Sequence, residues 1–147
     1  TIPFWKRRKV WLKLDDAEGE ILDFSMFAAT TGETFGGGYK VCPGVTPLDK
    51  EGSLVYAPRL SRLAMLSLMG PMKNGKHIGK WGITQCKANR IEIKPVDKDG
   101  RVCDSPIEPI TWVQADGEPV ITAPATLEWH TEQLLVRGSK DVPWDSK

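Results

Sequence analysis

The chain has 147 residues, of which 40% are hydrophobic and 27% are charged, and its formal net charge is +1. This length suits one domain with a core of its own, and the nearly neutral charge gives no global indication of nucleic-acid binding. The longest strongly apolar run, Leu63 to Met69, is much shorter than the roughly 20 residues of a membrane-spanning helix. Three scattered cysteines, Cys42, Cys86 and Cys103, form no Cys-x-x-Cys pair, which favours a reducing compartment.

The first part of the chain predicts β-strands. VWLKL (10–14) alternates apolar and polar residues, as a half-buried strand does, and ILDFSMFAA (21–29) is apolar enough to predict a more deeply buried strand. The glycine-containing acidic segment between them predicts a hairpin turn. Two short strands are expected at GYKVCP (38–43) and SLVYAP (53–58), each ended by a proline.

One segment departs from this pattern. LSRLAMLSLM (60–69) has apolar residues near helical spacing, and Gly70-Pro71 is a stop signal, so we expect a helix of about three turns from Leu60 to Met69. The loop after it, GKHIGKWG (75–82), is basic.

The second half again predicts strands joined by turns. Strand patterns occur in ITQCKANRIEIKP (83–95), in ITWVQADGEPVIT (110–122) around an Asp-Gly turn, and in ATLEWHTEQLLVRG (125–138). Another Asp-Gly turn lies in VDKDGRVCD (96–104). Roughly eight strands with closely spaced turns predict a mainly all-β fold, a sandwich or a barrel, with one short helix.

Three glycines in a row, Gly36, Gly37 and Gly38, allow two interpretations. A phosphate-binding loop should lead into the N-terminus of a helix, whereas these glycines lead into the strand-like YKVCP. A bulge or a close approach of two backbones is therefore favoured.

Acidic residues gather at two turns. Asp97, Asp99 and Asp104 superficially suggest a calcium loop, but the further ligands of that pattern are missing, so a hairpin turn is favoured. Asp49 and Glu51 lie beside another turn, where they either hold a hard cation or are simply solvated.

The remaining polar clusters are less specific. His77, in the basic loop, and His130, in a strand, have no partner at ligand spacing, so no zinc site is expected. WKRRK (5–9) combines an aromatic residue with four cations, which suits an anionic membrane surface and equally the solvated start of a strand.

Several motifs in order resemble the C-terminal domain of the diacylglycerol kinase and sphingosine kinase family of lipid kinases. The motifs are FGGGYKVCPGVTPLDKEGSL (35–54), LSRLAMLSLM (60–69), GKH (75–77), KANRIEIKP (87–95) and ADGEPV (115–120). The resemblance covers about Val10 to Arg137. It implies one domain over residues 1–147, with tails at 1–9 and 138–147.

The resemblance implies an antiparallel β-sandwich that forms one wall of an active-site cleft in a two-domain kinase. Such a kinase phosphorylates the primary hydroxyl of a diacylglycerol-like or sphingoid lipid with ATP and Mg²⁺. The Gly-Gly-Asp-Gly-Thr motif of its nucleotide-binding domain is absent here, so this chain alone is expected to be inactive.

The implied partners are the lipid substrate, the missing N-terminal kinase domain and, peripherally, a membrane on its cytoplasmic side. A homodimer is compatible with the resemblance, and nucleic acid is not expected.

The resemblance also implies site residues. Glu118, flanked by Asp116 and Gly117, matches a glutamate assigned as proton acceptor or placed at the nucleotide, and a positioned carboxylate can accept the proton that a lipid hydroxyl loses. The alternative is a solvated hairpin turn. Gly36 to Gly38 would shape a strand entry and leave the phosphates to the other domain.

A structural Mg²⁺ site of bacterial members matches the carboxylate of Glu51 and the backbone carbonyls of Leu48 and Ser53. The sequence departs from the family pattern here, because Glu51 replaces an aspartate in a longer loop. Thr31 also stands where the family usually has an asparagine.

Two alternatives remain open. The chain is either the substrate-binding domain of a lipid kinase or a non-catalytic β-sandwich module that binds lipid or protein. Likewise, Leu66, Leu68 and Met69 of the predicted helix either line a lipid path or belong to the core.

Overall fold

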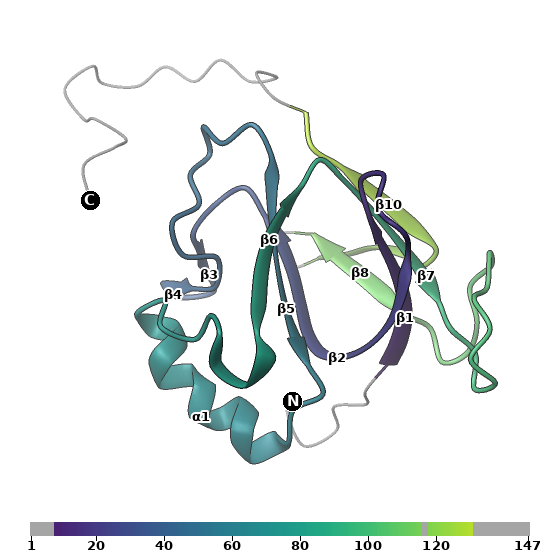
Figure 1. Ribbon diagram of the computed structural model, residues 1–147, viewed down its shortest axis with the longest axis horizontal. Helices are drawn as coiled ribbons and strands as arrows, with labels where there is room; N and C mark the ends of the chain where they lie inside the picture. Colours follow the sequence, from purple (N-terminus) through teal and green to yellow (C-terminus); the bar gives the residue numbers. More distant parts are fainter. Residues whose placement is uncertain (1–7, 116–117, 131–147) are drawn as a thin grey trace.

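The computed structural model describes residues 8–115 and 118–130, which form a mostly β, antiparallel fold with one α-helix (Figure 1). None of the helices in this part of the chain combines the length and the apolar character needed to cross a membrane. In chain order the elements are β1 (Arg8–Leu14), β2 (Glu20–Thr30), β3 (Thr34–Phe35), β4 (Tyr39–Lys40), β5 (Gly52–Pro58), α1 (Arg62–Lys73), the short 3₁₀ helix η2 (Lys80–Gly82), β6 (Thr84–Ala88), β7 (Arg90–Pro95), β8 (Trp112–Ala115), β9 (Glu118–Thr122) and β10 (Ala125–Glu128).

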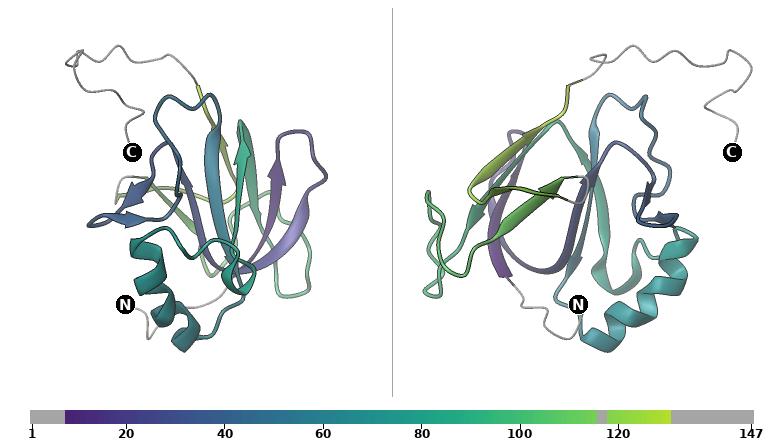
Figure 2. Two further views of the ribbon diagram at one scale, coloured as in Figure 1. Left: turned by 60° about the vertical axis from the view of Figure 1, so that its left-hand side comes forward. Right: turned by 180° about the vertical axis from the view of Figure 1, so that it is seen from behind.

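Six of the strands form one curved antiparallel sheet in the order β10-β7-β1-β2-β5-β6. The hairpins β3–β4 and β8–β9 form separate two-stranded sheets. Seen from behind, the β8–β9 hairpin crosses one side of the curved sheet, whereas α1 lies beside the β5–β6 end (Figure 2). The predicted mainly β, antiparallel class is therefore confirmed, as are the hairpins at residues 15–19 and around Asp-Gly 116–117.

Strand β5 is buried on both faces, so it divides the core into two clusters. Leu54 faces one cluster and Val55 faces the other, and both side chains are 0% exposed. The helix-side core contains Val41, Cys42, Val45, Val55, Ala57, Leu60, Leu68 and Ile83. The sheet-side core contains Val10, Leu12, Leu54, Ala88, Ile91, Ile93 and Ala123.

Strands β1 and β7 show the alternation that the sequence predicts. Val10 and Ile91 are fully buried in the sheet-side core, because successive side chains of a strand point to opposite faces. Trp11 lies on the other face, where the Lys94 ammonium is 5.2 Å from its ring centroid. One face of this part of the sheet is thus core, and the other is capped by an aromatic–cation contact.

The helix differs from its predicted limits of Leu60 and Met69. Ser61 is the N-cap, with its Oγ accepting a hydrogen bond from the Ala64 N–H, and α1 continues through Pro71 to Lys73. A proline normally clashes with the Cβ of the residue before it. Gly70 has no Cβ, which removes that clash, and only the last turn loses a hydrogen bond. The Gly-Pro pair is therefore not the stop that we expected.

Two strand predictions are also corrected. Strand β2 is not deeply buried, since Ser25 is its one buried residue and the others are half-buried or exposed. The GYKVCP strand shortens to Tyr39–Lys40, because Val41 and Cys42 turn away to fill the helix-side core.

The chain enters the sheet earlier than predicted. Arg8 and Lys9 belong to β1, although the sequence interpretation placed them in an N-terminal tail. The predicted tail at 138–147 and residues 1–7, including most of WKRRK, lie outside the described residues.

A β-bulge in β2 fixes the start of α1. The register shifts between Phe24 and Met26, which leaves Ser25 as the extra residue. Its buried Oγ accepts a hydrogen bond of 2.8 Å from the backbone N–H of Leu60. The segment that leads into α1 is thereby attached to the middle of the sheet.

Candidate functional site

Glu118 is the first residue of β9, at the end of the β8–β9 hairpin. It pairs with Ala115 across the hairpin, its side chain is exposed, and it forms no ion pair with another described residue. Asp116 and Gly117 lie outside the described residues. An exposed carboxylate can accept a proton from a hydroxyl, provided that a second wall holds that hydroxyl against it.

The three glycines form the turn of the β3–β4 hairpin. Gly36, Gly37 and Gly38 are exposed and have φ values of 39°, 78° and 87°, a left-handed conformation that residues with a Cβ seldom adopt. The turn leads into β4 and is followed by no helix until Arg62. It therefore lacks the helix N-terminus that a phosphate cradle uses.

The hairpin at 96–104 is organised by one carboxylate. Asp97 Oδ1 accepts hydrogen bonds from the backbone N–H groups of Asp99 and Arg101, at 2.9 and 2.8 Å. Asp104 instead pairs with Lys94 at 2.7 Å. Asp97 thus stabilises the turn and Asp104 pairs with a strand residue, as the hairpin interpretation predicts.

The predicted Mg²⁺ ligands lie at the entry to β5. Leu48 and Glu51 are exposed in the loop, whereas Ser53 lies inside β5, with Thr30 of β2 on one side and Lys87 of β6 on the other. Backbone groups within a sheet face the neighbouring strands, so the Ser53 carbonyl is less available to an ion than the Leu48 carbonyl.

The other carboxylate of this loop is already engaged. Asp49 accepts a hydrogen bond of 2.9 Å from Thr46 Oγ1 and lies 3.3 Å from Lys87 Nζ. These partners, Thr46 first, hold the pKa of Asp49 below its usual value. Among the described residues, no three His, Cys, Asp or Glu side chains gather as metal ligands. The Mg²⁺ site therefore stays a prediction.

His77, which the sequence analysis placed in the basic loop after the helix, is buried. Its side chain is 0% exposed, and Nε2 lies 3.0 Å from the Val41 carbonyl oxygen. Within the described residues, Nδ1 has no hydrogen-bond partner. Burial lowers the pKa of His77, and the Val41 carbonyl only partly offsets this. His77 thus acts as a neutral link between the loop after α1 and the segment after β4. His130, by contrast, is exposed.

The three apolar residues of the helix divide into two groups. Leu68 is 3% exposed and belongs to the helix-side core, whereas Leu66 and Met69 are 48% and 46% exposed. A separate open groove of about 540 Å³ lies beside the end of β7. Its lining includes Lys9, Asp97 and Lys98, and neither Glu118 nor the predicted Mg²⁺ ligands belong to it.

The comparisons with known proteins agree with this fold. Residues 1–137 match the family model described as "YegS C-terminal NAD kinase beta sandwich-like domain". No curated protein matches the chain.

Three solved structures from Bacillus anthracis str. Sterne are similar. Two are described as "a putative diacylglycerol kinase", at 18% and 20% identity with TM-scores of 0.63 and 0.62, and one as a diacylglycerol kinase, at 19% identity with a TM-score of 0.59. They cover 85%, 84% and 84% of this chain, which spans only 36%, 36% and 38% of theirs. At identities of 18% to 20%, the similarity to these structures shows a shared fold and nothing more.

Proposed function

Because the chain belongs to the family of YegS C-terminal NAD kinase beta sandwich-like domains, we propose that it is the substrate-binding C-terminal domain of an ATP-dependent lipid kinase. The substrate would be the primary hydroxyl of a diacylglycerol-like or sphingoid lipid. The family match over residues 1–137 is the observation that carries this proposal. Residues 1–147 would act as one domain.

The fold neighbours support a two-domain arrangement. The chain spans little more than a third of each neighbour, so the remainder of such a protein has room for a nucleotide-binding domain. That domain would hold Mg²⁺-ATP, and this chain would supply the opposing wall of the cleft. The whole protein would act in the cytoplasm at a membrane surface, where its lipid substrate lies.

Glu118 is the residue of this chain that we place at the chemistry. Its exposed carboxylate at the end of the β8–β9 hairpin would accept the proton of the lipid hydroxyl as the phosphoryl group is transferred. The hairpin that carries it is a two-stranded sheet of its own, separate from the six-stranded sheet.

The test is a phosphorylation assay on the full-length protein that contains this chain and the nucleotide-binding domain. Labelled ATP is offered with diacylglycerol, sphingosine, ceramide or phosphatidylglycerol. We expect activity on one lipid class, and a loss of about 10²- to 10⁴-fold in kcat for Glu118→Gln. Glu20→Gln, at an exposed glutamate of β2, is the matched control and should keep its activity. A folded full-length protein without activity on any lipid would favour the non-catalytic module.

A further inference from the structure

The outer face of α1 is apolar although it faces solvent. Leu63, Leu66 and Met69 recur every third residue and are 79%, 48% and 46% exposed, whereas Leu68 is buried in the helix-side core on the opposite side. A helix normally buries its apolar side and exposes a polar one. An exposed row of three large apolar side chains instead indicates a surface that something covers.

Both ends of this apolar row carry a cation. Arg62 is the first residue of α1 and Lys73 is the last, and both are exposed. At 3.6 residues per turn they fall on the same face as Leu66. The helix is about 18 Å long, so the row forms an apolar strip with a positive charge at either end.

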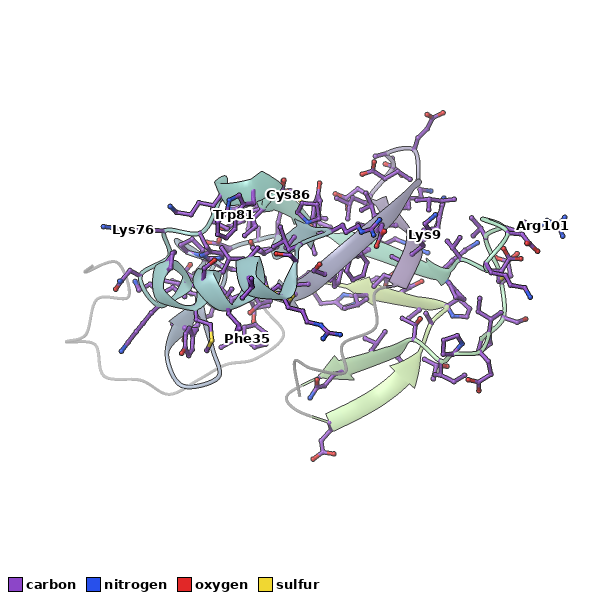
Figure 3. The ribbon with its side chains drawn as sticks, turned by 90° about the horizontal axis from the view of Figure 1, so that it is seen from below. Lys9, Phe35, Lys76, Trp81, Cys86 and Arg101 are labelled. Carbon is purple, nitrogen blue, oxygen red and sulfur yellow. The ribbon has the colours of Figure 1, made fainter. Side chains whose placement is uncertain are left out.

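An exposed tryptophan lies beside the helix. Trp81 of η2 is 53% exposed and has a φ of 49°, which is uncommon for a residue with a bulky side chain. A Cβ on Gly82 would lie 3.1 Å from Pro58, just ahead of α1 in the chain. Seen from below, Trp81 and Lys76 lie along one flank of the helix (Figure 3).

The segment of the chain that contains this helix is strongly basic. The segment 52–91 contains seven Lys and Arg and no Asp or Glu, whereas the other 107 residues contain thirteen basic and nineteen acidic residues. Lys87 and Arg90 pair with acidic residues elsewhere. The other five are exposed and form no ion pair with a described residue: Arg59, Arg62, Lys73, Lys76 and Lys80.

We propose that the outer face of α1, together with Trp81, docks on the surface of an anionic lipid bilayer. The leucines and Met69 would enter the boundary between headgroups and acyl chains, as the apolar face of an interfacial helix does. The five cations would contact lipid phosphates, and Trp81 would lie at headgroup level. A bilayer offers apolar and negatively charged partners over one continuous surface, which matches this combination.

The inference deepens the proposed function, because such docking would bring the domain to its lipid substrate. Only the biological purpose of the docking rests on the proposed function; the docking itself does not. The binding test below uses no phosphorylation, so a failure of docking and a failure of the kinase assignment are distinguishable.

The test is co-sedimentation of the 147-residue chain with vesicles of phosphatidylcholine alone or mixed with an equal part of phosphatidylglycerol. We expect binding to the mixed vesicles that added salt weakens. Replacing both Arg62 and Lys73 by Gln should weaken binding about 20- to 30-fold, at about fivefold per cation. The matched control replaces Lys98 and Arg101, which are exposed at the 96–104 hairpin, and should bind as the parent chain does.

The apolar row is tested in the same way. Replacing Leu63 and Leu66 by Ser should weaken binding by about tenfold or more. Ile21→Ser, at a side chain that is 46% exposed, is the control and should have no effect. Equal binding to both vesicle types, or unchanged binding of the variants, would overturn the proposal. So would a dimer in sedimentation equilibrium that the Leu63 and Leu66 replacements dissociate, since a second copy would then cover this face.

Discussion

The hydrogen bond between Ser25 and Leu60 gives a sharp test of how α1 is held. Ser25→Ala removes a single heavy atom, the Oγ that accepts a hydrogen bond of 2.8 Å from the Leu60 N–H. Ser25 is 1% exposed and Leu60 is 8% exposed. Water therefore cannot replace the lost acceptor without opening the structure.

The expected cost follows from that burial. A typical hydrogen bond contributes about 0.5–1.5 kcal/mol net, and a buried donor left without a partner costs about 1–3 kcal/mol. We therefore expect the variant to lose about 2 kcal/mol of its free energy of unfolding. For a chain of this length that lowers Tm by roughly 4–8 °C.

The assay is urea unfolding followed by tryptophan fluorescence, with a thermal scan beside it. Ser67→Ala is the matched control, because Ser67 Oγ donates to the Ala64 carbonyl on the exposed side of α1, and it should stay within about 0.5 kcal/mol. If Ser25→Ala loses no more than Ser67→Ala, the Leu60 N–H does not depend on Ser25, and our account of the bulge is wrong.

Two further predictions concern buried side chains. Because burial lowers the pKa of His77, the unfolded chain binds its proton more readily, so stability should be complete above about pH 6.5 and fall as the pH drops below it. In His77→Gln, Tm should fall less between about pH 7.5 and 5.5 than in the parent chain. In His130→Gln, at an exposed site, Tm should fall as much as in the parent chain. The same dependence of Tm on pH in both variants would contradict this. Burial also raises the pKa of Cys42 to about 11, so a thiol reagent at about pH 8 should modify half-buried Cys103 first and Cys42 only on unfolding. Equal labelling rates in the folded protein, read by peptide mass spectrometry, would refute it.

The strands could be predicted because their pattern is local. Alternating residues such as Ile91 and Ile93 lie on the buried face of β7 as expected. Asp99-Gly100 lies in a real turn, and β8 and β9 pair as the second Asp-Gly signal predicts. The predicted end of α1 was wrong because the effect of a proline depends on its context. Gly70 has no Cβ for the Pro71 ring to meet, and Pro71 lies in the last turn, where one hydrogen bond is lost.

Burial was harder to predict because it depends on distant partners. Nothing in GKHIGK distinguishes a buried histidine from a solvated one, since Val41, the residue that holds His77, is 36 positions away. The basic surface near α1 was visible in the sequence. The net charge of the whole chain, +1, does not reveal it, but the segment 52–91 contains no Asp or Glu.

The candidate catalytic residue came from resemblance rather than from pattern. The Asp-Gly pair predicts the hairpin that carries Glu118, but no local signal distinguishes a catalytic glutamate from a solvated one. Its role depends on a second wall, which is supplied by residues beyond this chain in the arrangement that we propose.

The burial of β5 on both faces leaves its alignment with β2 and β6 open to slippage. A strand with one polar face cannot shift by one residue without burying that face, but β5 is mostly apolar on both sides, with Ser53 as its one buried polar side chain. Two contacts at its ends oppose the shift. Beyond its last residue the Leu60 N–H must meet Ser25, and at its first residue Gly52 lies against the Trp129 indole, where any Cβ would collide. Contacts of particular residues, the Ser25 hydrogen bond and the missing side chain of Gly52, thus help to align β5 where its hydrophobic pattern alone would not.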